Sequence, residues 1–311
     1  MKKEVSVILP CYNAACFLER LVSSLLNQKV SPVEIIVVDS QSTDDTEKIA
    51  RELGCKVFSI SQKDFNHGGT RNFASLQAKG DLLVFMTQDA LPVDPFFLQH
   101  LLDPIISGKT VASFARQIPY PNASAVEKFA RVFNYPPVSQ IRTPASIKSM
   151  GIGAYFFSNV SSAIRKDVFL DVGMFADNVI MNEDMLLCAN LLNKGHNVAY
   201  TAKAQVYHSH DYSLKQTFRR YFDIGVFFSR NLHILNVSAG LRGADYSRSL
   251  ILEMTRQSDW IALFNAFFEI GAKLAGYRLG KLEKFIPVVI KKRLSMHAGY
   301  WNPKTPNKAV F

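Results

Sequence analysis

Short apolar runs separated by amphipathic segments make up the front part of the chain. Four runs that stop at polar residues are typical of strands buried on both faces of a sheet: Val5–Leu9, Glu34–Val38, Lys56–Ile60 and Asp81–Met86. Apolar residues recur at helical spacing in the segments after these runs: Ala14–Gln28, from a cap at Ser42 or Thr43 to Gly54, Thr70–Lys79 and Pro92–Leu102. This alternation predicts an α/β fold with a mostly parallel sheet and helices as crossover connections.

The middle of the chain is less regular. We predict strands near Val111–Gln117 and Gly153–Arg165, on either side of a mobile loop, Tyr135–Met150. An amphipathic helix over Asn182–Lys194 and a strand over Val198–Tyr207 follow.

Polar residues follow the carboxyl ends of the four front strands. They form four clusters: Pro10–Asn13, Asp39–Ser42, Phe65–Asn72 and Gln88–Asp89. Because ligands of parallel α/β sheets bind outside the carboxyl ends of the strands, we expect all four clusters on one rim, around a binding site.

The third cluster, FNHGGTRN, combines a histidine, two glycines and an arginine. Paired glycines permit positive φ and a close approach of a ligand to the backbone, and Arg71 is suited to phosphate oxygens. A Gly-Gly turn followed by a surface arginine is the alternative, which this short stretch favours when taken alone.

Composition and charge limit the possible classes of protein. The chain has 311 residues, of which 48% are hydrophobic and 12% aromatic, so it is not a disordered protein and can form one large domain or one domain with an appendage. Residues 1–211 hold 20 Lys and Arg against 20 Asp and Glu, whereas residues 212–311 hold 16 against 6, which is 16 − 6 = +10. The spacing beyond Leu214 is helical, and we expect this basic region to face an anionic membrane, a nucleic acid or a protein partner.

Several features indicate a cytoplasmic protein. The four cysteines form no CxxC pair, as is typical of reduced thiols. The apolar run after the basic N-terminus is too short for a signal peptide, and no apolar stretch reaches the length of a membrane span. The C-terminal tail is expected to be loosely ordered.

Five motifs occur in an order that resembles the inverting family 2 glycosyltransferases. They are VSVILPCYNA, EIIVVDSQSTDDT, GGTRN, TQDA and NEDMLLCANLL, and they span roughly residues 4–215. FNHGGTRN and TQDA together are similar to the bacterial rhamnosyltransferase branch, which builds O-antigen and related polysaccharides from dTDP-rhamnose. The resemblance implies a GT-A domain over residues 1–215, with a nucleotide-binding sheet flanked by helices and a small acceptor-side sheet. Residues 216–311 would be a basic helical extension.

The resemblance also implies a site for the nucleotide diphosphate sugar. Asp39 would bind the base or ribose, although a carboxylate that caps the next turn is the alternative. Arg71 and the glycine backbone would neutralise the pyrophosphate beside a helix N-terminus. The remaining residues expected at the nucleotide are Pro10, Tyr12, Asn13, Ser40, His67, Gly68 and Gln88. For His67, packing of the ring on the sheet is an equal alternative.

Asp89 is expected to bind a divalent cation, Mg²⁺ or Mn²⁺, that bridges the diphosphate. The usual Asp-x-Asp motif has Thr87 at its first position here, so a strict metal requirement does not follow from the motif. His208 is the preferred second ligand, with His210 on the same face of the strand as an alternative. Either histidine could instead be an ordinary residue at the end of a strand.

Asp184 matches the catalytic base of the family, and Glu183 is expected to support it. The helix N-terminus is expected to lower the pKa of Asp184 and keep it ionised. Both carboxylates could also serve only as partners of the helix dipole.

The basic region is expected to contact the cytoplasmic face of the inner membrane, where a lipid-linked saccharide acceptor would lie. Aromatic residues at helical spacing over Trp260–Leu282 and the cluster Lys291-Lys292-Arg293 suit an anionic leaflet. A core-packing helix pair and contact with a second copy of the chain are the alternatives. No nucleic-acid partner is expected, because no recognised binding motif accompanies the charge. The competing functions are a transferase that uses a UDP- or GDP-sugar and a non-catalytic nucleotide-sugar-binding protein.

Overall fold

The computed structural model describes residues 3–231 and 242–302, and they fall into two compact units. Among the described residues, the first unit holds 3–178, 183–211 and 242–246, and the second holds Val179–Asn182, 212–231 and 247–302. The tail expected to be loosely ordered is residues 301–311; Trp301 ends a 3₁₀ turn and is buried, and residues 303–311 lie outside the described residues.

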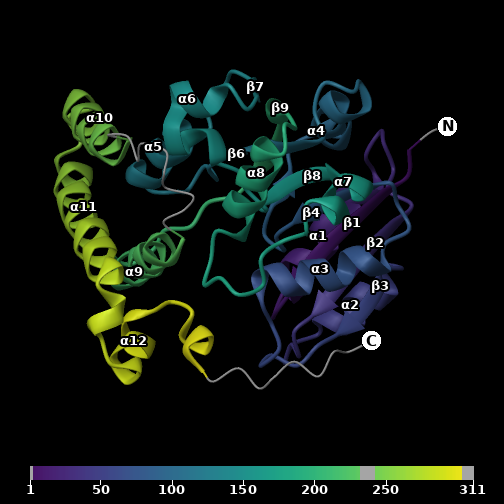
Figure 1. The fold of residues 1–311 in the computed structure, drawn as a ribbon, viewed down its shortest axis with the longest axis horizontal. Coiled ribbons are helices and arrows are strands. Elements are labelled where there is room, and N and C mark those ends of the chain that lie inside the picture. The colour runs from purple at the N-terminus through teal and green to yellow at the C-terminus, as the bar shows by residue number, and fades with distance from the viewer. Residues whose placement is uncertain (1–2, 232–241, 303–311) are drawn as a thin grey trace. The chain divides into compact units, whose positions relative to one another are not determined.

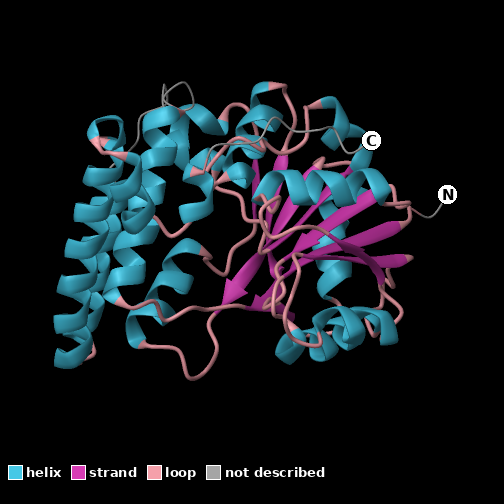
Figure 2. Cartoon of the chain, turned by 90° about the horizontal axis from the view of Figure 1, so that it is seen from below, coloured by secondary structure: helices cyan, strands magenta, loops and turns pink. Residues whose placement is uncertain are grey.

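One sheet of nine strands, counted over the described residues, forms the centre of the first unit (Figures 1 and 2). Its strands are β1 Val5–Cys11, β2 Glu34–Asp39, β3 Lys56–Ser59, β4 Leu82–Met86, β5 Leu91–Pro92, β6 Ala112–Ile118, β7 Gln140–Arg142, β8 Ser161–Arg165 and β9 Val198–Tyr207. Helices flank the sheet: α1 Ala15–Leu26, α2 Thr46–Glu52, α3 His67–Gln77, α4 Phe97–Ile106, α5 Ala125–Asn134, α6 Ser146–Met150, α7 Lys166–Asp171 and α8 Glu183–Asn193.

The order of the sheet is β3-β2-β1-β4-β8-β6-β9-β5, with β7 paired to β9. The strands β1 to β4 pair in parallel, as their apolar runs predict. The strand β8 is antiparallel to both β4 and β6, and β6 pairs with β9 in parallel. The resemblance implied a separate small acceptor-side sheet, whereas here the sheet is continuous from the nucleotide-side strands to β9.

The core lies between one face of the sheet and the helices α1 and α4. The helix α1 buries four apolar side chains on the stripe that its spacing predicts: Leu18, Leu21, Val22 and Leu25. Fully burying a side chain of this size contributes roughly 1.5–3 kcal/mol. This packing holds the carboxyl ends of β1, β2 and β4 at one rim.

Three predicted elements are wrong in their bounds. Of the predicted strand over residues 153–165, only Ser161–Arg165 is a strand, because residues 151–155 form a 3₁₀ turn. The predicted mobile loop contains β7 and α6, because residues 140–142 pair with the edge of β9. The helix predicted from Pro92 begins at Phe97, because Leu91 and Pro92 pair with β9.

The N-cap predicted for α2 is also wrong. The residue at that position is Asp45, without a side-chain cap. Ser42 and Thr43 instead make hydrogen bonds with Asp39 and Asn13, so they hold two rim loops together.

In the second unit, α9 Leu214–Arg230 packs against α11 Trp260–Lys281 through glycines (Figure 1). A Cβ atom placed on Gly280 would lie 2.0 Å from the carbonyl oxygen of Phe222, and one on Gly276 would lie 2.3 Å from that of Phe218. Only glycine permits two helix backbones to approach so closely. The short helix α12 Val288–Leu294 follows, and α10 Arg242–Arg256 runs from the first unit into the second.

Candidate functional site

The ends of β1 and β4 are joined by a pair of reciprocal hydrogen bonds. The backbone N–H of Tyr12 donates to Oε1 of Gln88 (2.8 Å), and Nε2 of Gln88 donates to the Tyr12 carbonyl (3.1 Å). The Tyr12 ring remains exposed beside Pro10 at the rim. These hydrogen bonds therefore hold the ends of β1 and β4 together at the rim, and the exposed Tyr12 ring can still contact a ligand.

Asp39 and Asn13 organise the loops on the other side of β1. Both carboxylate oxygens of Asp39, which is buried, accept hydrogen bonds from Ser42, and Oδ1 of Asn13 accepts one from Thr43 N–H (2.9 Å). Asp39 thus has the turn-capping role that the sequence left open. Each carboxylate oxygen has a further lone pair, so a ligand donor can still be accepted. Ser40 is buried beside it, and its hydroxyl has no hydrogen-bond partner among the described residues.

The two glycines of FNHGGTRN lie in the first turn of α3, and neither adopts the positive φ that glycine permits. Asn66 caps the helix, and its Oδ1 accepts from the N–H groups of Gly68 (3.0 Å) and Gly69 (2.8 Å). A Cβ atom on Gly68 would lie 2.2 Å from the carbonyl oxygen of Ala176. Glycine is therefore needed at this position for the approach of another chain segment, and its N–H is already used by the cap.

Arg71 is buried and directed at the start of α8. Its side chain is 4% exposed, Nη1 donates to the carbonyl of His67 (2.8 Å), and the same atom lies 3.7 Å from Oε1 of Glu183. Nε has no partner among the described residues. In this structure the guanidinium faces a buried carboxylate, and the expected contact with pyrophosphate stays a prediction. The His67 ring packs edge-on against Phe65, which lies in the loop before α3.

Glu183 and Asp184 place two neighbouring carboxylates at the N-terminus of α8. Nδ2 of Asn159 donates to Oε1 of Glu183 (3.2 Å), and its backbone N–H donates to Oδ2 of Asp184 (3.1 Å). Burial opposes ionisation of Glu183, but His67 and Arg71 offset it and hold the pKa of Glu183 below its ordinary value.

For Asp184 the expected direction is wrong. Burial and the adjacent Glu183 charge raise its pKa to about 7, despite the hydrogen bonds from Asn159 and Met185. A carboxylate with a pKa near 7 is a better proton acceptor at neutral pH than one with an ordinary pKa. The pair therefore combines one ionised carboxylate with one that can take up a proton.

Asp89, His208 and His210 bring three potential metal ligands together. Oδ2 of Asp89 lies 3.0 Å from Nε2 of His210 and 3.5 Å from Nε2 of His208, and the two Nε2 atoms are 3.1 Å apart. One ligand atom from each residue lies within 4.8 Å of the others. Burial would raise the pKa of Asp89, but His210 and His208 more than offset it, so the pKa lies well below its usual range.

This donor set suits a divalent ion. One carboxylate and two imidazoles on one side leave open positions for other ligands, an arrangement typical of transition-metal sites. Mg²⁺ prefers an all-oxygen shell, which these residues do not provide. The usual motif has a carboxylate at the position of Thr87, whereas the cluster here has one carboxylate and two histidines.

Two residues at this site were not singled out by the sequence. Asn159 contacts both α8 carboxylates from the loop before β8, and Gln117 contacts His208 from β6. No local motif marks either one, because their roles arise only from pairing of distant strands. His210, the alternative ligand, could be found from its spacing of two residues along the strand.

The chain matches a known protein family and is similar to two rhamnosyltransferases. A family model described as glycosyl transferase family 2 matches residues 6–173. The O-antigen chain rhamnosyltransferase RfbN of Salmonella typhimurium is 36% identical over 310 residues, with 96% of each chain covered. The O-antigen chain rhamnosyltransferase WbaN of Salmonella anatum is 37% identical over 305 residues, covering 96% of this chain and 95% of the relative.

Solved structures share the fold at lower sequence identity. The mannosyltransferase PcManGT from Pyrobaculum calidifontis, in complex with GDP-Man and Mn²⁺, is 17% identical with a TM-score of 0.60, covering 96% of this chain and 86% of that one. TarS residues 1–349 from S. aureus are 19% identical with a TM-score of 0.57, covering 90% and 91%. This likeness confirms the predicted α/β fold of the GT-A type.

Proposed function

This chain belongs to glycosyl transferase family 2, and on that premise we propose that it transfers rhamnose from dTDP-rhamnose onto a growing O-antigen-like polysaccharide. The observation that carries the proposal is the identity of 36–37% to two O-antigen chain rhamnosyltransferases over nearly their whole length. The acceptor is then a lipid-linked saccharide. The donor residues proposed are Pro10, Tyr12, Asn13, Asp39, Ser40 and Gln88, which share one rim.

Asp184 is the proposed catalytic base. It takes the proton from the acceptor hydroxyl, whose oxygen forms a bond to the anomeric carbon as the bond to the nucleotide diphosphate breaks. A single displacement inverts the configuration at that carbon. Glu183, held ionised beside Arg71, keeps the pKa of Asp184 high enough for this proton transfer.

Asp89, His208 and His210 are the proposed ligands of a divalent cation. The imidazole ligands favour a transition-metal ion such as Mn²⁺ over Mg²⁺, and the PcManGT neighbour is in complex with Mn²⁺. A bound ion would supply positive charge to the diphosphate leaving group.

A donor screen with the purified protein tests the function. With an acceptor extract and Mn²⁺, we expect release of nucleotide diphosphate from dTDP-rhamnose and much less from UDP- or GDP-sugars. Binding of dTDP should also raise the melting temperature more than binding of UDP or GDP. Release only from a UDP- or GDP-sugar would reassign the donor. Protection by nucleotides without any transfer would favour the non-catalytic alternative.

We further propose that residues 1–215 form the catalytic domain of a cytoplasmic enzyme, and that residues 216–311 attach it to the inner membrane. Among the described residues, no helix combines the length and apolar character needed to span a bilayer. Support for attachment comes from α11, whose small residues Ala262, Ala266, Gly276 and Gly280 are buried. Its large apolar residues point outward instead: Trp260, Ile261, Phe264, Phe267, Phe268 and Leu274 are all exposed.

This exposed strip continues past α11, and cations flank it there. Phe285, Val288 and Val289 are exposed beyond α11, and they follow three exposed cations: Arg278 and Lys281 at the end of α11 and Lys284 just after it. The acidic residues of 260–302 are both paired: Glu269 with Lys273 (2.5 Å), and Glu283, which is buried, with Arg230 (2.9 Å) and Lys291. Apolar side chains ringed by cations suit the headgroup region of an anionic leaflet.

One residue of the cationic surface cluster that the sequence predicts is not on the surface. Lys291 is buried against Glu283 and the Trp301 ring, so it does not belong to the surface cluster that the sequence indicated. The core-packing alternative is wrong for the α11 aromatics, since Trp260 is 68% and Phe264 is 64% exposed.

We expect the protein to co-sediment with anionic vesicles and the variant Arg278/Lys281/Lys284→Gln to bind them roughly 100-fold more weakly. Each cation near the surface contributes about 1 kcal/mol, and about 1.4 kcal/mol is a factor of ten. High salt should remove this electrostatic contribution to vesicle binding, whereas Phe264/Phe268→Ala should remove the apolar contribution, which resists salt. The matched control is Lys29/Lys48/Lys63→Gln, which removes three exposed cations from the first unit. The proposal would be contradicted if all variants bound vesicles as well as the control does. If the protein is a dimer that Phe264/Phe268→Ala dissociates, the strip is instead a contact with a second copy of the chain.

A further inference from the structure

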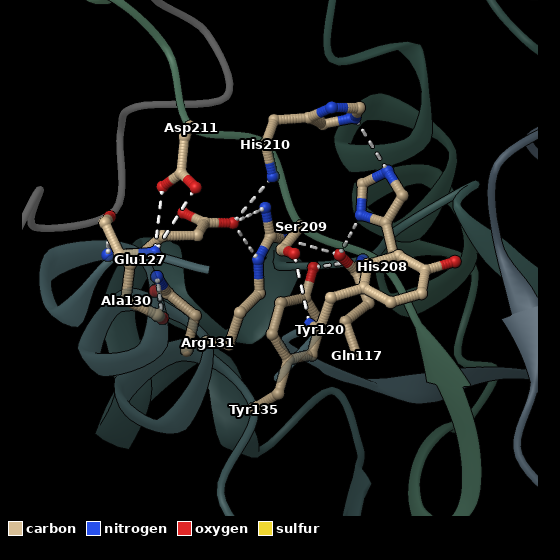
Figure 3. Close-up of polar contacts among 12 residues, drawn as sticks. Gln117, Tyr120, Glu127, Ala130, Arg131, Tyr135, His208, Ser209, His210 and Asp211 are labelled. Atoms are coloured by element: carbon tan, nitrogen blue, oxygen red, sulfur yellow. Dashed lines mark hydrogen bonds and ion pairs between the residues drawn. The ribbon is translucent and has the colours of Figure 1, made fainter. Parts of the chain in front are cut away.

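We propose that Arg131, through Gln117, holds the neutral His208 ring in the Nδ1–H tautomer, so that Nε2 carries no hydrogen and its lone pair faces Asp89 and His210. The inference rests on the proposed role of these three residues as metal ligands. It makes Gln117 and Arg131 positioning residues, since Arg131 contacts Gln117 and Gln117 contacts His208 (Figure 3).

The argument begins with Gln117 Oε1, which faces two nitrogens. Nη1 of Arg131 donates to it, and Nδ1 of His208 lies 2.9 Å away. A guanidinium can only donate, so the amide atom that it faces must be the oxygen. The His208 nitrogen that faces the same oxygen must then carry a hydrogen. In the neutral ring, which is the form that can bind a metal, the other nitrogen, Nε2, then has the lone pair.

The nitrogen of the Gln117 amide is also hydrogen-bonded, so a flip that exchanged the amide oxygen and nitrogen would break these hydrogen bonds. Nε2 donates to the Tyr135 hydroxyl (2.6 Å) and to Oγ of Ser158 (2.9 Å). Arg131 is held in turn by Glu127, four residues earlier on α5 (2.6 Å). A buried network with all its members satisfied specifies one arrangement more strongly than its separate bonds suggest.

The same helix also holds the backbone of the second histidine. Oε1 of Glu127 accepts from the N–H of His210 (3.1 Å), and Asp211 accepts from the N–H of Ser124, the N-cap of α5 (3.2 Å). Figure 3 shows these contacts converging from α5 on the segment after β9. Partners of this kind orient metal-bound histidines, and their loss typically lowers metal affinity about 10–100-fold.

The test compares Arg131→Met with Gln117→Glu. In Arg131→Met the amide loses the donor that fixes its orientation, so we expect Mn²⁺ affinity to fall about 10–100-fold, measured by electron paramagnetic resonance of free Mn²⁺. Gln117→Glu keeps an oxygen toward both nitrogens, so it should retain affinity within a few-fold. The matched control is Arg51→Met, which breaks an exposed Glu47–Arg51 pair with the same spacing on α2.

A second readout does not need the metal. In protein labelled with ¹⁵N-histidine, two-bond ¹H–¹⁵N spectra report which ring nitrogen of His208 carries the hydrogen. We expect the Nδ1–H form in the wild type, Gln117→Glu and Arg51→Met, and a mixture in Arg131→Met. An Nε2–H form in the wild type, or an unchanged tautomer in a folded Arg131→Met, would overturn the inference. If the wild type binds no Mn²⁺ but shows this tautomer pattern, only the proposed metal fails.

Discussion

Replacement of Asp184 by Asn is expected to lower the rate of sugar transfer about 100- to 10,000-fold, the range for loss of a general base. The amide keeps the shape of the side chain, and its single oxygen can still accept from Asn159 or from Met185, whose N–H groups bond to different oxygens of Asp184. Donor binding should therefore be nearly unchanged, as measured by the shift in melting temperature with nucleotide. Transfer is followed as release of nucleotide diphosphate. Full activity in Asp184→Asn together with a large loss in Glu183→Gln would assign the base to Glu183.

The pH dependence gives an independent check on the same pair. The base acts when it is ionised, so kcat/KM should fall as the pH drops through about 7, the pKa to which burial and Glu183 raise Asp184. Glu183→Gln removes the negative neighbour, which should move this limb to lower pH. A limb that stays in place would show that Glu183 does not set the pKa.

Asp89→Ala is expected to produce the second-largest effect, a loss of Mn²⁺ affinity of at least about 100-fold, because the only carboxylate of the cluster is removed. Transfer should fall with it, and EDTA should abolish transfer by the wild type. Asp167→Ala is the control, since Asp167 is an exposed carboxylate paired with Arg165. If EDTA leaves the wild type fully active, the metal assignment of Asp89, His208 and His210 is wrong.

The front strands could be predicted from the sequence because their signals are local. The strands β1, β2 and β4 are almost continuous apolar runs that parallel pairing buries on both faces, whereas β3 is a short, half-buried strand at the edge of the sheet. The strands β5 and β7 were not predicted, because they have two and three residues and exist only through pairing with β9. Short edge strands carry too few residues for a periodic pattern.

Several contacts of the rim residues could not be predicted, for one physical reason. The sequence shows that Gly68 and Arg71 are suited to a phosphate, but it does not show that Ala176 and Glu183 lie against them. The raised pKa of Asp184 depends in the same way on burial that only the tertiary structure creates. Local chemistry thus indicated where the site lies, and long-range packing decided what several of its residues do.

The pairing of β5 with β9 has a consequence for synthesis of the chain. Leu91 and Pro92 lie opposite Tyr207 and Val206, and this contact brings Asp89 beside two histidines that are made much later. Such distant pairing forms slowly, because a long loop must close first. A nascent chain that ends before His208 holds only one of the three proposed ligands. On the proposed assignment, the ion can bind only after β9 has joined the sheet, so metal affinity would mark a chain whose sheet is complete.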